Sequence, residues 1–226
     1  MKVDPASAWL SQEYQGILQF VGYSAGMYKT LLIGIVVLGV LCGGAAMQES
    51  KSSQAEVFKI DPVHSTTLFR IHHAGAGRFW GRFNGVTGTV AWPRDDSASP
   101  IFDIRVAANS VDTGNERLDG TLKGPDFFNT REFEDVSFKS TSAERIRDGH
   151  WKVTGDMTML GVTKPVTAEV EVTGVRGNPV VAKAGWEAWF EINRSDFGMD
   201  WGVENGALSD DVKMIVALEG GIEPGR

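Results

Sequence analysis

The sequence contains a single cysteine, Cys42, and this residue lies inside an apolar N-terminal stretch. If that stretch is removed, the mature chain has no thiol, which excludes disulfides and thiol catalysis and suits an oxidising compartment. Clusters of lysine and arginine are also missing, and the formal net charge is −7. Because nucleic acids and anionic membranes attract basic patches, nucleic acid is not expected as a partner, and any membrane contact is expected to be transient.

Motifs for catalysis or metal binding are equally scarce. His72 and His73 are adjacent, so on a strand they point to opposite faces and do not share one ion. A zinc site takes about three or four protein ligands, and neither H-E-x-x-H nor a G-x-S-x-G nucleophile elbow is present. We therefore expect no catalytic residue, no metal site and no cofactor, and we expect His64 to hydrogen-bond a loop.

Residues 27–46, MYKTLLIGIVVLGVLCGGAA, have the pattern of a secretory signal peptide. One lysine precedes an apolar run and small residues follow it, so cleavage is expected directly after this segment. An uncleaved anchor is the alternative, although the run is short for a membrane span, which needs about 20 apolar residues. Residues 1–26 carry Asp4 and Glu13 where a signal has basic residues, so we interpret them as an upstream extension, with translation starting at Met27.

A polar linker, residues 47–56, precedes a domain at residues 57–220 and a short tail at 221–226. Within the domain, alternating apolar and polar residues predict about eight strands. Eight antiparallel strands with one apolar face each can bury those faces together in a closed barrel, which leaves no open edge. A β-sandwich is the alternative. The predicted strands lie near residues 67–72, 86–92, 102–106, 136–139, 151–159, 166–173, 186–193 and 212–218.

A long segment between the strands that end near Ala108 and begin near Asp135 is too apolar for disorder. Loops longer than about 12–15 residues are usually functional or disordered, so we expect this one to cap the barrel. A short helix is predicted over residues 116–123. Phe127 and Phe128 would then form the underside of a lid, beside Asp126 in a turn or capping position.

The inward-facing positions of the predicted strands carry large, adaptable side chains. A barrel of about eight strands is just wide enough to be filled by side chains or to hold one small ligand. Aromatic rings and thioethers around a channel suit a flexible apolar chain, although any one of them is more often plain core. The predicted ligand-binding residues are Phe69, Ile71, Ile104, Phe127, Phe128, Phe138, Trp151, Met157, Met159, Trp186, Phe190 and Ile192.

Several segments together resemble the YceI-like family, which comprises lipocalin-like polyisoprenoid-binding proteins of bacterial periplasms. The resemblance covers roughly residues 57–220, and the segments come in the family's order. The sequence departs from the family at Thr121 and Leu160, where members often carry histidine, so a role attached to those histidines is in doubt here. The similar segments are IDPVHSTTLFRIHH (60–73), GRFNGVTGTV (81–90), DTGNERLDGTLKGPDFFNTREFEDVSFKST (112–141), VTGDMTMLGVTKPVT (153–167), INRSDFGMD (192–200) and LSDDVKMIVALEG (208–220).

The resemblance implies an all-β fold, an eight-stranded up-and-down antiparallel β-barrel. It also implies a pocket for a long isoprenoid chain, such as a quinone tail or a polyprenyl lipid, without catalytic apparatus, in a periplasmic or secreted protein. Another long-chain amphiphile, such as a fatty acid or amide, is the first alternative ligand. A lipid-modifying enzyme and an accessory module of a membrane redox complex are alternatives from other classes, and a homodimer stays open.

Overall fold

The computed structural model describes residues 55–93, 98–176 and 182–222. The predicted upstream extension, signal segment and most of the linker lie outside the described residues, as does most of the tail. Within the described part, no helix is both long and apolar enough to cross a membrane.

All strands of the described domain belong to one antiparallel sheet, accompanied by three short helices. The strands are β1 (Glu56–Ile60), β2 (Thr66–His73), β3 (Gly77–Phe83), β4 (Val86–Trp92), β5 (Ile101–Ala107), β6 (Val111–Asp112), β7 (Asp135–Arg147), β8 (His150–Met159), β9 (Val162–Arg176), β10 (Lys183–Asn193) and β11 (Leu208–Gly221). The helices are η2 (Ala108–Ser110), α1 (Glu116–Leu122) and η3 (Arg194–Phe197).

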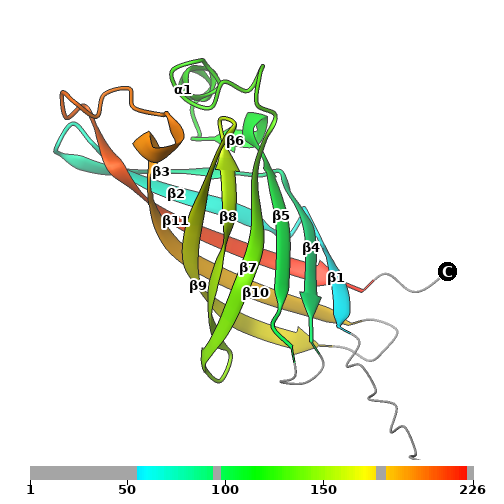
Figure 1. Cartoon of the computed structure of the whole chain (residues 1–226). Coiled ribbons are helices and arrows are strands. Elements are labelled where there is room, and N and C mark those ends of the chain that lie inside the picture. The colour runs from blue at the N-terminus through cyan, green and yellow to red at the C-terminus, as the bar shows by residue number, and fades with distance from the viewer. Residues whose placement is uncertain (1–54, 94–97, 177–181, 223–226) are drawn as a thin grey trace, which may run out of the picture. The chain divides into compact units, whose positions relative to one another are not determined.

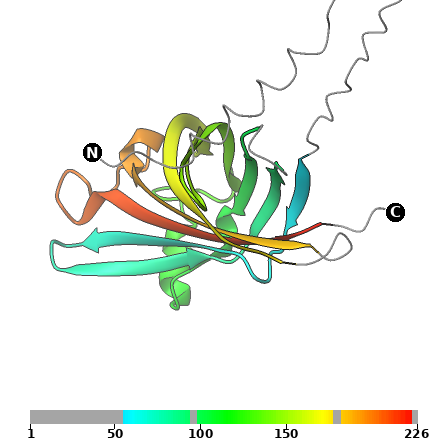
Figure 2. The same cartoon turned by 90° about the horizontal axis from the view of Figure 1, so that it is seen from below.

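The sheet closes on itself (Figures 1 and 2). β11 pairs with β10 on one side and with both β2 and β1 on the other. Successive strands β1 and β2 therefore occupy one position in the sheet. β4 pairs with β1 and β3 pairs with β2, so β3 and β4 share the next position. β5 pairs with β4 and β6 pairs with β3, so β5 and β6 share the position after that. The result is the predicted eight-stranded up-and-down barrel, and the sandwich alternative is wrong.

One end of the barrel is filled by aromatic rings, which we call the aromatic floor. Trp186, 1% exposed, lies at its centre, with its ring centroid 5.5 Å from that of Phe58, 5.9 Å from Trp92 and 6.3 Å from Phe102. These residues come from strand ends that lie together at the bottom of Figure 1, opposite α1. Because offset and edge-to-face ring packing fills space tightly, this end of the barrel is closed.

A glycine on β3 makes room for an aromatic side chain on β2. Gly81 pairs with Phe69, and a Cβ at Gly81 would lie 2.2 Å from the ring carbon Cζ of Phe69. The ring therefore lies directly over the glycine, and it also packs at 5.7 Å against Phe83. The absence of a side chain at residue 81 thus fixes where Phe69 stands inside the barrel.

We expect Gly81→Ala to lower the free energy of unfolding by about 1–3 kcal/mol, the usual cost of overpacking a core. Gly77→Ala is the matched control on the same strand, because a Cβ there meets no heavy atom within 4 Å. Urea unfolding followed by circular dichroism compares the two variants. Equal stability would contradict the close packing of Phe69 on Gly81.

Candidate ligand-binding cavity

A cavity of about 680 Å³ occupies the barrel between the aromatic floor and α1. This volume lies within the range of about 300–1,000 Å³ that is usual for small-molecule sites. Its wall is mainly apolar. The predicted ligand-binding residues that line it are Phe69, Ile71, Ile104, Phe127, Phe128, Phe138, Met157, Met159, Trp186, Phe190 and Ile192. Their contact with a ligand stays a prediction.

Trp151 does not line the cavity, although its position on β8 faces inward as predicted. Its ring packs edge-on against Trp92, with 5.7 Å between centroids, and so belongs to the aromatic floor. The alternation of a strand gives the face to which a side chain points, but it does not give the depth in the barrel.

Several residues of the wall are absent from the predicted set. Val212 and Met214 follow the inward alternation of β11 and could have been included on that signal. Met199 and Trp201 lie in the loop between η3 and β11, where no periodicity marks them. Together with Met157 and Met159, the methionines give the wall several flexible, polarizable side chains, which adapt to irregular partners.

The predicted lid is present, and its two adjacent phenylalanines contact different parts of the barrel. Phe127 packs against Trp201, with ring centroids 5.5 Å apart. Phe128 packs edge-on against Phe83 of β3 at 5.1 Å. Both rings line the cavity, and Asp126 lies in the turn before them. The pair therefore clamps the segment across the open end of the barrel, between β3 and the loop before β11.

Local hydrogen bonds explain why the lid begins with a helix. The side chain of Asn115 caps α1 by accepting hydrogen bonds from the backbone N–H groups of Arg117 and Leu118, each at 3.1 Å. Such a cap satisfies backbone donors that the first helical turn leaves free. The predicted helix at residues 116–123 is confirmed as Glu116–Leu122.

Asp112 anchors the base of the lid to β3. Its carboxylate accepts hydrogen bonds from Arg82 Nη2 at 2.8 Å, from Asn84 Nδ2 at 3.0 Å and from the Gly114 backbone N–H at 2.9 Å. The Arg82 guanidinium, with these other donors, lowers the pKa of Asp112 from 3.8 to about 2. The lid is thus tied to the barrel at the residue where β6 ends.

Arg194 is a buried cation in the cavity wall, 2% exposed. It donates hydrogen bonds to the backbone carbonyls of Ser209 and Met199, each at 2.9 Å, and of Leu208 at 3.3 Å. Burial lowers the pKa of the Arg194 guanidinium, and the nearby carboxylates of Asp210 and Asp200 oppose that shift. These bonds join η3 to β11, so Arg194 stabilises the packing of this helix on the strand.

His72 and His73 lie on opposite faces, as predicted. His73 lines the cavity and His72 does not, and the backbone N–H of His72 donates a hydrogen bond to Ser209 Oγ at 3.2 Å. Thr121 and Leu160 are the two positions at which the sequence departs from the family pattern. Thr121, on α1, lines the cavity. Leu160 has a φ of 52° in the turn between β8 and β9, a conformation that costs a branched side chain free energy.

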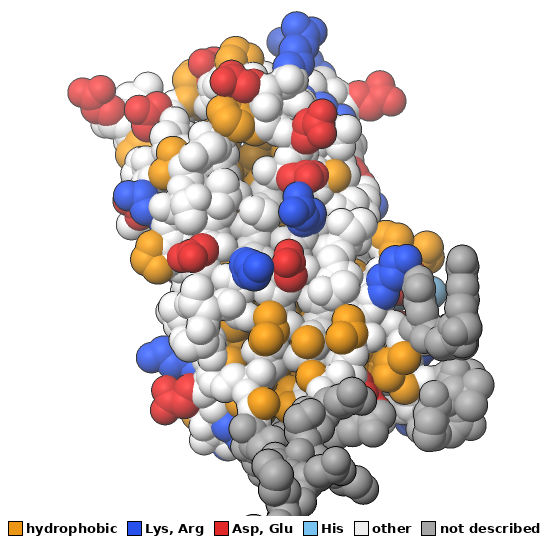
Figure 3. Space-filling view, turned by 45° about the vertical axis from the view of Figure 1, so that its right-hand side comes forward, with side chains coloured by type: hydrophobic (Ala, Val, Ile, Leu, Met, Phe, Trp, Pro, Cys, Tyr) orange, Lys and Arg blue, Asp and Glu red, His pale blue; other side chains and the backbone are white. Residues whose placement is uncertain are grey.

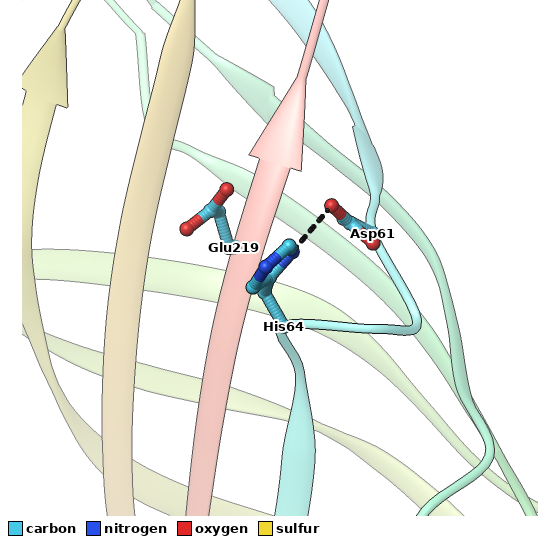
Figure 4. Close-up of side chains that lie close together, drawn as sticks. All are labelled: Asp61, His64 and Glu219. Atoms are coloured by element: carbon cyan, nitrogen blue, oxygen red, sulfur yellow. Dashed lines mark hydrogen bonds and ion pairs between the residues drawn. The ribbon is translucent and has the colours of Figure 1, made fainter.

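His64 hydrogen-bonds a loop carboxylate, as predicted, and the structure adds a third group from a distant strand (Figure 4). The His64 Nδ1 atom lies 2.8 Å from Asp61 Oδ2, and a carboxylate oxygen of Glu219 lies within 4.8 Å of both side chains' ligand atoms. The bond with His64 is the main cause that holds the pKa of Asp61 below its usual value. Lys183 pairs with Glu219. All members of the group therefore have protein partners, on the outside of the cavity.

The outer wall carries a short apolar row across three neighbouring strands. Val57 pairs with Ala91, and Ala91 pairs with Ile101. Val57 and Ile101 are 54% and 52% exposed. Figure 3, which brings this side forward, shows hydrophobic side chains gathered in its lower part. The row is small, because the charged Lys59 follows on β1.

The chain matches the family model described as the YceI-like domain over residues 58–220. A UPF0312 protein of Yersinia enterocolitica is 32% identical over 197 residues, which cover 86% of this chain and 98% of that relative. A crystal structure of a YceI protein of Campylobacter jejuni is 29% identical, with a TM-score of 0.56 over 62% of this chain and 83% of the other.

A further solved structure is a polyisoprenoid binding domain from Saccharophagus degradans implicated in plant cell wall breakdown. It is 16% identical to this chain, with a TM-score of 0.57 over 74% of this chain and 98% of the other. At this identity the likeness concerns the fold alone.

We expect the Asp112 anchor to stabilise the protein above about pH 4 and to lose that contribution as the pH falls toward about 2, because the folded-state pKa lies below the unfolded value. Asp112→Asn should therefore be less stable than the parent at neutral pH, and the difference should shrink through this window. Urea unfolding at several pH values measures it. In Arg82→Gln, a carbon-13 NMR titration should find the pKa of Asp112 raised toward its ordinary value; an unchanged pKa would contradict the assigned cause.

Proposed function

Because the chain belongs to the YceI-like family, we propose that it binds a long-chain isoprenoid lipid, of quinone or polyprenyl type, and sequesters or carries it in the periplasm. The observation that carries the proposal is the apolar cavity of about 680 Å³, closed by the aromatic floor and covered by the lid. The fold shared with the polyisoprenoid binding domain of Saccharophagus degradans supports it.

The wall can supply the affinity without ion pairs. Burying apolar surface contributes about 25 cal/mol per Å². At roughly 0.3 kcal/mol per heavy atom, a chain of about forty carbons reaches on the order of 12 kcal/mol, which corresponds to nanomolar binding. A flexible chain also needs a wall that adapts to it, and the methionine and aromatic side chains of this cavity do so.

A binding role fits the wall better than catalysis. General acid–base or nucleophilic chemistry needs polar side chains that converge on one reacting atom. Of the titratable wall residues, His73 lies on β2, Arg78 on β3, Asp126 on the lid and Arg194 on η3, and Arg194 is engaged with backbone carbonyls. We infer that the cavity holds its ligand without transforming it.

The periplasmic location rests on the sequence of residues 27–46, which has the pattern of an export signal. A compartment outside the cytoplasm also agrees with the mature chain's lack of cysteine. A lipid carrier in that compartment would move or buffer molecules that water does not dissolve.

The experiment that tests the proposal is native mass spectrometry of the protein purified from its own periplasm, followed by solvent extraction and lipid analysis. A stoichiometric quinone or polyprenyl species would support the proposal and name the cargo. A fatty acid or fatty amide would favour the alternative amphiphile. A protein that is empty and also fails to take up added isoprenoids would refute the proposal.

We expect Met157→Asp to abolish lipid retention, because the new carboxylate would lose its hydration against an apolar chain. Met157 is 6% exposed and lines the cavity. Thr158→Asp is the matched control, since Thr158 is the next residue on β8 and points outward, toward Thr163. Lipid content per protein is measured after circular dichroism has established folding. Phe190→Asp, at a half-buried wall position, serves if Met157→Asp does not fold, and lipid retention in a folded variant would contradict the assigned wall.

A further inference from the structure

A small polar hollow of about 250 Å³ lies on the outer wall of the barrel across β3, β2, β11 and β10, and we call it the outer pocket. It adjoins the ligand cavity, because Ile71 and Arg78 line both. Basic and acidic side chains share its lining. They are Arg70, His72, Arg78, Glu191, Asp211 and Lys213.

An irregular stretch of β11 borders the outer pocket. The register between β11 and β2 shifts between Leu208 and Val212. Within this stretch, Ser209 Oγ accepts a hydrogen bond from the His72 backbone N–H at 3.2 Å and donates one to the Asp211 carbonyl at 2.9 Å. Such irregularities re-aim side chains and are over-represented next to functional sites. Here the irregular stretch brings the Asp211 side chain into the lining of the outer pocket.

The outer pocket contains charges of both signs that the protein does not neutralise. Lys213 Nζ lies 3.5 Å from Glu191 Oε2, so these two charges offset each other. The guanidinium groups of Arg70 and Arg78 and the carboxylate of Asp211 have no charged partner among the described residues. A ligand that fits the outer pocket therefore carries both a negative and a positive group.

A phosphoethanolamine group meets this requirement. Guanidinium groups bind phosphate oxygens, and a primary ammonium donates hydrogen bonds to a carboxylate. Arg70 on β2 and Asp211 on β11 lie on neighbouring strands, which are about 4.8 Å apart. The two-carbon link of phosphoethanolamine holds its phosphate and ammonium a comparable distance apart. The chain has a net charge of −7, which repels an anionic surface, whereas a zwitterionic head group has no net charge.

Exposed tryptophans next to the outer pocket suit a lipid surface. Trp80 pairs with Arg70 across β2 and β3, is 47% exposed, and has its ring centroid 5.5 Å from the Arg70 guanidinium carbon. Tryptophan is enriched where a membrane meets water, because its ring is apolar and its N–H is polar.

The outer pocket also lies beside the open end of the barrel. The Ala74 backbone N–H donates to the Ala207 carbonyl at 2.8 Å, so the β2–β3 hairpin and the loop before β11 project side by side (Figure 1). Both elements contribute to the cavity wall, the loop through Trp201, which is 48% exposed. A bilayer that contacts these elements therefore meets the open end of the cavity.

We propose that the outer pocket binds the phosphoethanolamine head group of a phospholipid bilayer. Arg70 and Arg78 bind the phosphate, Asp211 accepts hydrogen bonds from the ammonium, and Trp80 enters the interface. This contact holds the open end of the barrel at the membrane, where an apolar cargo is exchanged. The inference goes beyond the proposed function, because it concerns the membrane surface and not the molecule in the cavity.

The test is co-sedimentation of the purified protein with vesicles of three compositions. One is phosphatidylcholine alone, and the others contain phosphatidylcholine with an equal part of phosphatidylethanolamine or of phosphatidylglycerol. Choline carries the same charge as ethanolamine but has no N–H to donate. We expect roughly three- to tenfold tighter binding to the phosphatidylethanolamine vesicles than to phosphatidylcholine, the range of about one net hydrogen bond. Phosphatidylglycerol vesicles should bind no more tightly than phosphatidylcholine.

Variants assign the preference to the outer pocket. Arg70→Gln and Asp211→Asn should each remove most of the preference for phosphatidylethanolamine, and neither residue lines the ligand cavity. Arg105→Gln on β5 and Asp156→Asn on β8 are the matched controls, since they remove the same charges at exposed positions outside the outer pocket. Lipids with brominated chains should quench the tryptophan fluorescence of the parent more than that of Trp80→Phe.

Three results would overturn the docking proposal and leave the proposed function standing, because the cargo in the cavity is identified separately by extraction. The first is equal binding of the parent to phosphatidylethanolamine and phosphatidylcholine vesicles. The second is tightest binding to phosphatidylglycerol, which would indicate attraction of the cations alone. The third is a preference that Arg70→Gln and Asp211→Asn leave unchanged, or that the control variants lower equally.

Discussion

The pairing of β11 with two successive strands on one side closes the sheet, and the cavity exists only because the sheet is closed. β1 pairs with the last residues of β11 and β2 with the earlier ones, so the chain steps from one to the other without leaving β11. The step is held by the backbone N–H of Asp61, which donates to the Glu219 carbonyl at 2.8 Å, and by Ser65 Oγ, which accepts from the Glu219 N–H at 3.0 Å. A sheet closed in this way presents its inward side chains to one another.

Closure of the sheet alone would leave a barrel with two similar ends. The barrel encloses a pocket because its two ends are covered differently. At one end, the rings around Trp186 fill the interior. At the other, the segment with α1 covers it through Phe127 and Phe128, which contact a loop and a strand that are distant in sequence. A ligand therefore has one end by which to enter and one end at which to stop.

Much of this architecture could be predicted from the sequence, because alternation records which side chains face inward. It predicts about eight strands and most of the cavity wall, whereas the family resemblance favours a barrel over a sandwich, and the segment that breaks the alternation marks the lid and its helix. Alternation carries no information about depth, so it predicts Trp151 in the wall, whereas the ring belongs to the floor. It also gives no information about partners that folding brings together, such as Glu219 beside His64. The missing hydrogen-bond partner of Trp186 is likewise visible only when its neighbours are known. Local pattern thus predicts orientation, and the unpredicted part of the site consists of long-range contacts.

The wall of the cavity supplies affinity more than selectivity. Methionine and aromatic side chains attract any long apolar chain, because burial of apolar surface is not directional and depends mainly on area. Such a wall distinguishes poorly between lipids of equal length. A buried donor discriminates more sharply, since a ligand without an acceptor leaves that donor unpaired in a place that water has left. The two unpartnered donors near the closed end, Thr67 Oγ1 and Trp186 Nε1, have almost no surface exposed to the cavity, so a bound chain does not reach them in this structure. Affinity therefore comes from the apolar area that the wall buries.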